Sequence, residues 1–403
     1  MTLARRVPRL RTAEQILQVA AALATDARDA AAQRDADRVL PHDQVAALKT
    51  SGLLALSVPV AHGGIDAPAT VLAEVFRLLA DADPSLAQIP QSHFTFLEAI
   101  RLQGSAAQRE FFYPLVLDGA LLANAQVERG PHPVDVDSTA LVSAGADFVL
   151  TGRKFYSTGA LFADWLAVRA SVNPDAAPNN RTPKAIAFVP VDAAGVQIID
   201  DWDGMGQRTT ASGTVVLDAV TVPGAQVVPF TPIFDRPTLY GARAQLVHTA
   251  IDVGIATGAL AEGVRQAAKA RPHFEAGVHD AAQDPTLIAL AGELTVTVRA
   301  AQALLAEAAR QVDAAQESLD ADSAAAASVA VAVAKVAAAR AALDASGALF
   351  ELGGTRSATA AANLSRYWRD ARTHTLHDAT RWKLQHIGRF TLSETRPPRH
   401  GQL

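Results

Sequence analysis

Apolar residues recur at helical spacing through the first part of the chain, from Thr12 to about Gly119. Three turn-forming stretches interrupt this pattern, "VLPHD", "VPVAHGGIDAPA" and "DADPS". Pro41 and Pro84 in these stretches suit the first turn of a helix, where the missing N–H costs nothing. We therefore expect an N-terminal helical domain over residues 1–120.

From about Leu121 the pattern changes to short β-branched and aromatic runs separated by Gly, Pro, Asn and Asp. The runs are "DFVLTGRKFYSTG", "DWLAVRASV", "KAIAFVPV", "GVQIIDDWDGMG" and "SGTVVLDAVTVP". Such runs are typical of strands joined by turns. They predict a central antiparallel β domain over residues 121–237.

Beyond Pro237, helical spacing returns in four long stretches. The breaks between them are "ARPHFEAGVHDAAQDP", "SLDADS" and "LGGTRS". Long helices with short connections favour an up-and-down bundle, so residues 238–403 are predicted to form a C-terminal four-helix bundle. Its helices are expected at 238–270, 285–318, 321–350 and 362–388. The predicted class is thus α+β with three domains.

Composition narrows the range of partners. The formal net charge of −5 gives no general positive field for nucleic acid or an anionic membrane. The chain has no cysteine, which excludes disulfides, thiolate metal sites and a cysteine nucleophile. Charges such as Lys335 and Arg340 interrupt the apolar segments, so we expect no membrane span. Glu14, Gln15 and Gln18 make the start of the chain read as an amphipathic helix instead of a signal peptide, and we expect a cytoplasmic protein.

Sulfur is scarce in this sequence, because Met1 and Met205 are the two sulfur-containing residues among 403. An alanine-rich composition is one explanation. A protein made when sulfur is limiting, whose own synthesis spares sulfur, is the other. Composition alone does not decide between them.

Five stretches carry a resemblance to a known family. "TGRKFYSTGALFADWLAV" looks like the flavin-wrapping strand of acyl-CoA dehydrogenases, and "GQRTTASGTVVLDAVTVP" is similar to their Gly-x-Arg-x-Ser-x-Thr element that ends in Val-x-Val-Pro. "SGLLALSVPVAHGG", "ELGGTRS" and "RDARTHTLHDATRW" fall in the matching order around these two. The whole chain therefore resembles the acyl-CoA dehydrogenase superfamily, with its helical domain, β domain and four-helix bundle.

Within the superfamily, "QIPQSHF", "GRKFYSTGALFADW" and "ARTHTLHD" are most similar to the dibenzothiophene monooxygenase branch, which includes sulfur-acquisition oxidoreductases and alkanesulfinate monooxygenases. These enzymes use reduced FMN (FMNH₂) and O₂, which adds at C4a of the flavin to give a (hydro)peroxyflavin. The resemblance implies a two-component monooxygenase that oxidises a small organosulfur compound of sulfone, sulfinate or thiophene type for sulfur acquisition.

Two departures distinguish the chain from the dehydrogenases themselves. Matching "RDARTHTLHDAT" to their catalytic segment places His377, Asp378, Ala379 and Thr380 at the tyrosine, glutamate, glycine and threonine. The loop "ANAQVERGPHPVDVD" lacks the threonine and the Gly-Ser-Asp that help seat flavin and acyl-CoA. An FAD-dependent acyl-CoA dehydrogenase is the alternative, and a non-catalytic flavin-binding scaffold is a minor one.

The resemblance assigns the flavin ring to the β domain. Tyr156, Ser157 and Thr158 correspond to the strand that lies along the isoalloxazine, where a hydroxyl can bond N5. Asn124 begins the strand that should face the ring from the other side, where its amide could hold a flavin oxygen. An ordinary polar patch on the strand is the alternative for these residues.

The resemblance assigns the flavin phosphate to the bundle. Arg271 and Phe274, in "ARPHF", match the family's Arg-x-x-Phe element, which reaches the flavin of the neighbouring subunit. Arg356 follows Gly353 and Gly354, where the backbone comes close and a guanidinium matches phosphate geometry. An arginine at that position favours FMN over FAD. The alternative for both arginines is an ordinary place at a helix end.

The two histidines of "ARTHTLHD" are the candidates for proton transfer. His374 and His377 lie three residues apart beside Asp378, a spacing that would also suit two ligands of a metal ion. No complete ligand set accompanies this pair, so we expect no bound metal. Histidine can give or take a proton near neutral pH, and His93 would complete the pocket wall. Buried packing roles are the alternative for all three. Ser157 and Asn124 join them as catalytic candidates.

Partners follow from the same resemblance. No Gly-x-Gly-x-x-Gly element recommends an internal nicotinamide site, so a separate NAD(P)H-dependent flavin reductase is expected. Arg271 and the alanine-rich stretch 321–345 favour a homotetramer. The sequence leaves open which organosulfur compound is used, which histidine handles the proton, and whether oxygen transfer is nucleophilic or electrophilic.

Overall fold

Six α-helices precede the first strand in the computed structural model, which describes residues 7–174 and 179–403. They are α1 (Ala13–Asp37), α2 (His42–Thr50), α3 (Ala69–Ala82), α4 (Pro84–Gln88), α5 (Gln91–Gln103) and α6 (Ala106–Leu117). The Asp83 side chain accepts hydrogen bonds from two backbone N–H groups of α4, and Pro84 lies in its first turn as predicted. Pro41 instead lies just before the first residue of α2.

The strands form one eight-stranded sheet in the order β6-β7-β3-β2-β4-β5-β8, with β1 pairing to β4. Most neighbours are antiparallel as predicted, but β4 pairs parallel with both β1 and β2, so the sheet is mixed. The chain between β1 and β4 is long enough for the crossover that a parallel pair needs. The strands are β1 (Leu122–Ala125), β2 (Ala140–Ala144), β3 (Asp147–Lys154), β4 (Trp165–Val172), β5 (Lys184–Pro190), β6 (Val196–Ile199), β7 (Thr214–Pro223) and β8 (Val227–Pro229).

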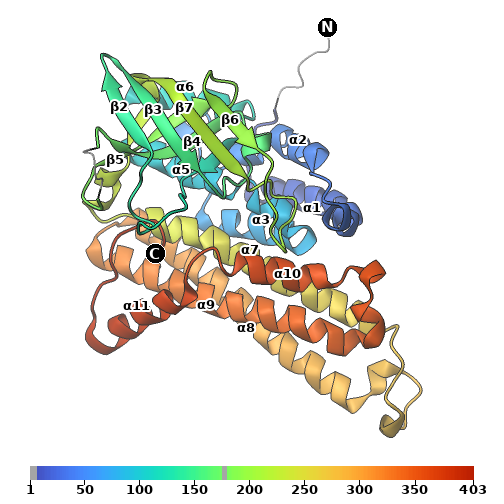
Figure 1. Ribbon diagram of the computed structural model, residues 1–403. Coiled ribbons are helices and arrows are strands. Elements are labelled where there is room, and N and C mark those ends of the chain that lie inside the picture. The colour runs from blue at the N-terminus through green and yellow to red at the C-terminus, as the bar shows by residue number, and fades with distance from the viewer. Residues whose placement is uncertain (1–6, 175–178) are drawn as a thin grey trace.

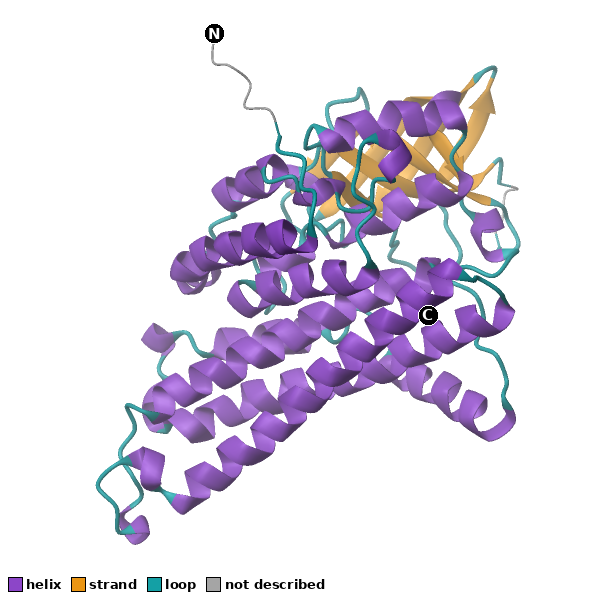
Figure 2. Cartoon of the chain, turned by 180° about the vertical axis from the view of Figure 1, so that it is seen from behind, coloured by secondary structure: helices purple, strands orange, loops and turns teal. Residues whose placement is uncertain are grey.

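The central strand β4 is buried on both faces. Ala167 points to a core that contains Phe96 and Phe112 from helices α5 and α6. Its neighbours Leu166 and Val168 point to the opposite core within the sheet. Figure 2 shows these helices lying over one face of the strands.

The C-terminal bundle contains five α-helices among the described residues, one more than predicted. They are α7 (Tyr240–Ala267), α8 (Pro285–Glu317), α9 (Ala321–Gly353), α10 (Ser365–His374) and α11 (Thr380–Ser393). The single helix predicted over 362–388 is wrong, because the chain turns at residues 375–379, inside the motif "THTLHDA". Asp378 therefore lies in the turn between α10 and α11, with its side chain buried.

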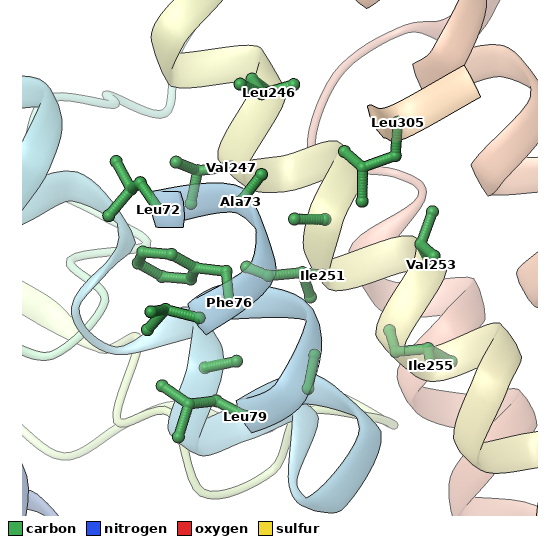
Figure 3. Close-up of a cluster of buried hydrophobic side chains, with 14 of the residues drawn as sticks. Leu72, Ala73, Phe76, Leu79, Leu246, Val247, Ile251, Val253, Ile255 and Leu305 are labelled. Carbon is green, nitrogen blue, oxygen red and sulfur yellow. The ribbon is translucent and has the colours of Figure 1, made fainter. Parts of the chain in front are cut away.

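Helix α3 joins the N-terminal domain to the bundle through α7. Leu72, Phe76 and Leu79 of α3 pack against apolar side chains of α7 such as Ile251 (Figure 3). The helices approach closely at Gly254, where a Cβ atom would lie 2.6 Å from the Ala80 Cβ. A larger residue at this position would force the two domains apart.

Three bundle helices are long and apolar enough to cross a membrane by length and composition, which the expectation from interrupting charges did not anticipate. In α7 and α9, 83% and 61% of the apolar window is buried inside the fold, so packing accounts for their hydropathy. In α8 the share is 17%. The apolar surface of α8 is therefore largely uncovered in a single chain.

Candidate active site

The β domain meets the bundle where the loop between β6 and β7 docks on α10 (Figure 1). The Gln207 N–H donates to the Asp370 carboxylate at 2.5 Å, and Arg369 Nη1 donates to the Met205 carbonyl at 2.8 Å. Gly206 rests directly on the backbone of Arg369. Burial raises the pKa of Asp370 to about 7. The contact fixes α10, and hence His374 at its end, relative to the β domain.

The segment after β3, which carries Tyr156, Ser157 and Thr158, is tied to the same loop. The Ser157 N–H donates to the Gly213 carbonyl at 3.0 Å. Thr158 Oγ1 lies 2.8 Å from Ser212 Oγ. The predicted ring-binding segment and α10 are thus both braced by one loop.

Several polar and aromatic groups of this segment remain available to a ligand. The Ser157 hydroxyl is buried and has no hydrogen-bond partner among the residues that the structure describes. Tyr156 is 42% exposed and has a positive φ of 55°. The Asn124 amide donates to the Tyr156 carbonyl at 3.1 Å and accepts from Gln126 at 3.0 Å. An unpaired buried hydroxyl beside an exposed ring fits a flat ligand with polar edges such as an isoalloxazine.

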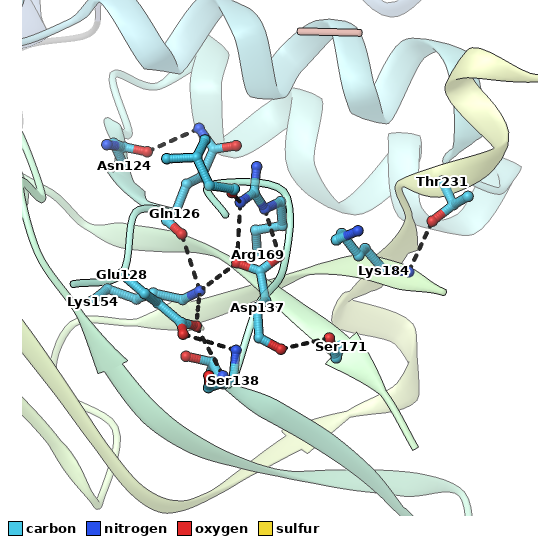
Figure 4. A network of polar contacts seen from close by, with 12 residues as sticks. Asn124, Gln126, Glu128, Asp137, Ser138, Lys154, Arg169, Ser171, Lys184 and Thr231 are labelled. Carbon is cyan, nitrogen blue, oxygen red and sulfur yellow. Dashed lines mark hydrogen bonds and ion pairs between the residues drawn. The ribbon is translucent and has the colours of Figure 1, made fainter. Parts of the chain in front are cut away.

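A buried ion-pair network holds the loop between β1 and β2 (Figure 4). Lys154, which is fully buried, contacts Glu128 at 2.7 Å and Asp137 at 3.0 Å, and Arg169 contacts Asp137 at 2.7 Å. Burial acts to raise the pKa of Glu128, but Lys154 outweighs it and lowers this pKa to about 2. Sequence reasoning missed this network. The available signal was Lys154, a lysine at an inward-facing position of a predicted strand.

The histidines form a column that runs from the accessible end of the site into the bundle. His377 is exposed, and its ring centroid lies 4.0 Å from that of His248, which is 2% exposed. His248 Nδ1 lies 3.2 Å from His374 Nε2, and His374 Nδ1 lies 2.5 Å from Asp252 Oδ1. Lys335 contacts the other oxygen of Asp252 at 2.7 Å. We call His377, His248, His374, Asp252 and Lys335 the histidine column.

Sequence reasoning found His374 and His377 but missed the other three members. His248 and Asp252 are four residues apart in "LVHTAIDVG", so they share one face of α7. Two polar residues on one face of a largely apolar helix were the signal. No group of three or more His, Asp or Glu side chains within 7–174 and 179–403 is arranged to hold a metal ion.

Asp378, at the position of the dehydrogenase glutamate, is 7% exposed. It pairs with Lys383 at 3.2 Å, and Lys383 also donates to the Gln402 carbonyl at 2.8 Å. Burial acts to raise the pKa of Asp378, but the lysines Lys335 and Lys383 outweigh it and lower this pKa. Neither carboxylate oxygen has a hydrogen-bond partner among the described residues, so it is burial beside Lys383 that keeps this carboxylate away from a substrate.

His93 does not join the column. Its Nε2 donates to the Leu54 carbonyl at 2.9 Å, and its Nδ1 accepts from the Leu122 N–H at 3.1 Å. Burial lowers its pKa to about 4. Both ring nitrogens bond the backbone inside the core, which favours the packing role that the sequence left as the alternative, and the predicted catalytic role of His93 stays a prediction.

The predicted phosphate-binding residues lie together at the far end of the bundle. Arg271 and Phe274 are in the exposed loop between α7 and α8, where Phe274 is 84% exposed. Arg356 follows Gly353 and Gly354 at the end of α9, and it donates to the carbonyl of Lys269 in the last turn after α7 at 2.6 Å. We call this region the distal tip.

The distal tip is too far from the histidine column to hold the same flavin within one chain. On α9, Gly353 lies 18 residues beyond Lys335. At a rise of 1.5 Å per residue this is about 27 Å along one helix, much longer than the span from a flavin ring to its phosphate. Figure 2 shows the tip at the end of the long helices, away from the strands.

Comparison with known proteins agrees with the architecture. Residues 11–120 match the family model of the N-terminal domain of acyl-CoA dehydrogenases, and residues 246–382 match that of a C-terminal domain. The chain is 32% identical to a dibenzothiophene monooxygenase of Rhodococcus erythropolis, covering 87% of this chain and 86% of that one. It is 31% identical to a probable FMNH₂-dependent monooxygenase, SfnC, of Pseudomonas putida, covering 94% and 95%.

The crystal structure of TdsC from Paenibacillus sp. A11-2 with FMN and indole superimposes with a TM-score of 0.90 at 30% identity, covering 97% of this chain and all of that one. The fold, the order of the motifs and the sequence similarity over most of the chain agree. The chain therefore belongs to the acyl-CoA dehydrogenase superfamily, in the branch of flavin-dependent monooxygenases that contains dibenzothiophene monooxygenase.

Proposed function

We propose that this protein is the oxygenase of a two-component FMNH₂-dependent monooxygenase that oxidises a small organosulfur compound. The observation that carries the proposal is the contrast between His377 and Asp378. An acyl-CoA dehydrogenase needs a free carboxylate to remove a proton from the substrate. Here Asp378 is buried against Lys383, whereas the accessible group beside it is the imidazole of His377.

Reduced FMN, when bound, supplies the reaction with O₂ from which one oxygen atom reaches the substrate. Ser157 and Asn124 would hold the polar edge of the ring, because one offers an unpaired hydroxyl and the other an amide beside it. His377 would hold or release the proton at the accessible end of the column. The junction of β domain and bundle would keep water from the reacting atoms.

The phosphate end of FMN would be held by the distal tip of a second subunit. Arg271 and Arg356 offer guanidinium groups, and Phe274 offers an exposed apolar face. The uncovered apolar surface of α8 gives a second copy a surface to pack on. These features support the homotetramer expected from the sequence, with each flavin shared between two subunits.

The substrate class rests on three supports. One relative acts on dibenzothiophene by its name, and another is named as FMNH₂-dependent. The low sulfur content of the chain suits a protein made when sulfur is scarce. Sulfones, sulfinates and thiophenes all remain within this class, and reduced flavin would come from a separate reductase.

Purified protein tests the proposal. Chemically reduced FMN and O₂ should convert at least one of dibenzothiophene, dimethyl sulfone and methanesulfinate to a product that carries one more oxygen atom. NADH with FMN should give no turnover until a flavin reductase is added. Bleaching of bound flavin by an acyl-CoA under anaerobic conditions, without oxygenation of any sulfur compound, would instead support the dehydrogenase.

A further inference from the structure

The hydrogen bonds inside the histidine column define which ring nitrogens carry protons. Asp252 is fully buried beside Lys335, and the charge of Lys335 and the bond from His374 outweigh burial to lower its pKa. An ionised carboxylate can only accept, so His374 Nδ1 carries the proton of the 2.5 Å contact. His374 Nε2 is then an acceptor, and the proton of the 3.2 Å contact belongs to His248 Nδ1.

The same logic leaves one free position. With Nδ1 of His248 protonated, its Nε2 is an acceptor, and this nitrogen has no hydrogen-bond partner among the residues that the structure describes. The His248 ring lies nearer to His377 than the His374 ring does, with centroid distances of 4.0 and 6.5 Å. The free nitrogen therefore belongs to the imidazole that packs directly behind the exposed His377.

We propose that Asp252, His374 and His248 form a proton relay that stores one proton at His374 and thereby switches His248 Nε2 from acceptor to donor. When His248 Nε2 gains a proton, its Nδ1–H bond breaks and a His374 Nε2–H bond forms. The stored charge is then an imidazolium beside the Asp252 carboxylate. No electrons move, and return of the proton reverses the steps.

Charge balance decides the resting state. Two buried pairs already cancel, Asp252 with Lys335 and Asp378 with Lys383. Burial and the neighbouring histidines and lysines lower the pKa of His248 well below its usual value, so a proton is not retained there. The groups that face the two rings from α7, α9, the loop after α10 and α11 are Asp252, Lys335, His377, Asp378 and Lys383. Because these groups are neutral overall, the resting relay holds no extra proton. Lys335 maintains this state because its charge already balances that of Asp252.

Ring-nitrogen NMR tests the relay without any turnover. In protein labelled with ¹⁵N at the histidine rings, two of the three buried histidines His93, His248 and His374 should be Nδ1–H tautomers at pH 7. His248→Gln should remove one of these signals and His374→Gln the other. The matched control His93→Gln should remove an Nε2–H signal and leave both. An Nε2–H tautomer at either His248 or His374, or a doubly protonated His374 in the resting protein, would overturn the proposal.

Lys335→Met tests the storage site. Without the lysine, the buried Asp252 charge should draw a proton to His374, and both nitrogens of His374 should be protonated at pH 7. A neutral His374 in this variant would contradict storage there. The double variant Asp252→Asn/Lys335→Met keeps the charge balance and removes the store.

The catalytic role of the relay rests on the proposed function. The predicted tautomers of His248 and His374 do not depend on it. In single-turnover mixing with reduced FMN and O₂, Asp252→Asn/Lys335→Met should oxidise the organosulfur substrate about 10- to 100-fold more slowly, with a changed pH profile and unchanged FMN affinity. A wild-type rate and pH profile would sink the relay while leaving the monooxygenase intact. Wild-type protein without any oxygenation would sink the function while leaving the tautomer result.

Discussion

The histidine column and the distal tip are two regions that the sequence assigned to one flavin, and they differ in almost every physical respect. Apart from His377 the column is buried, and its charges are paired within 3 Å. The tip is exposed, with Phe274 projecting into solvent. On the proposed function, a single chain would complete the proton-handling end of the site and leave the phosphate end open.

The column is held rigidly by burial, whereas the tip is not. Groups that move protons must keep fixed distances and a dry surrounding, which burial among α7, α9 and α10 would provide. Groups that bind a phosphate need charge and reach, which an exposed arginine retains until a partner covers it. The column should therefore respond to substitution in rate and stability, and the tip in cofactor affinity.

The largest effect is expected from His377→Ala. General acid or base action contributes about 10²- to 10⁴-fold in rate, so oxygenation should fall by that factor while FMN still binds. Single-turnover mixing of the FMNH₂-loaded variant with O₂, followed by product analysis, measures the loss. Near-normal product yield would leave His377 with a packing role only.

Stability should separate the two regions next. Asp252→Ala leaves Lys335 buried without its partner, which costs about 3–5 kcal/mol of unfolding free energy. The matched tip variant Arg356→Ala removes an exposed side chain and should cost about 0.5 kcal/mol or less. Urea unfolding of both variants gives the comparison, and equal losses would show that the column is not the more tightly coupled region.

The dependence of stability on pH reports on His93, a buried histidine that lies outside the column. The pKa of His93 is about 4 in the fold against 6.5 in the unfolded chain, so the unfolded state gains a proton first as the pH falls. Stability from this residue is present above pH 6.5 and declines to pH 4 by about 3 kcal/mol. The stability advantage of wild type over His93→Gln should shrink by that amount between pH 7 and pH 4.

Asp370 should show the opposite sign. Its pKa is raised to about 7 from 3.8, so the folded state holds the extra proton and gains stability as the pH falls through this range. Comparison with Asp370→Asn separates this contribution from that of His93. For His93, the contradicting result is a difference in unfolding free energy between wild type and His93→Gln that stays constant at all pH values.

The last of these effects concerns cofactor binding at the tip. Arg271→Ala should weaken FMN binding by about 1.5–3 kcal/mol, the usual value of a hydrogen bond to a charged group, and should not unfold the protein. Fluorescence titration with FMN measures it, and Arg236→Ala, another exposed arginine outside both regions, is the control. Equal affinity in the two variants would remove Arg271 from the phosphate site.

Sequence reasoning predicted the order of a helical part, a β part and long C-terminal helices because the hydrophobic period changes sharply near Leu121 and Pro237, whereas the domain bounds stay a prediction. It missed the break at residues 375–379, since no Gly or Pro marks it and the break depends on burying polar groups. It placed His374 and His377 from a motif but missed His248 and Asp252, whose partners come from other helices. For His93, nothing in the sequence indicated that both ring nitrogens would meet backbone groups.

Subunit complementation tests the shared flavin site most directly. Co-expression of His377→Ala and Arg271→Ala chains should produce mixed pairs in which one site combines the intact column of one chain with the intact tip of the other. At an FMNH₂ concentration that saturates wild type but not Arg271→Ala, random pairing would restore about a quarter of wild-type oxygenation, although each variant alone is impaired. Activity no higher than the average of the two separate variants would contradict a site built from two subunits.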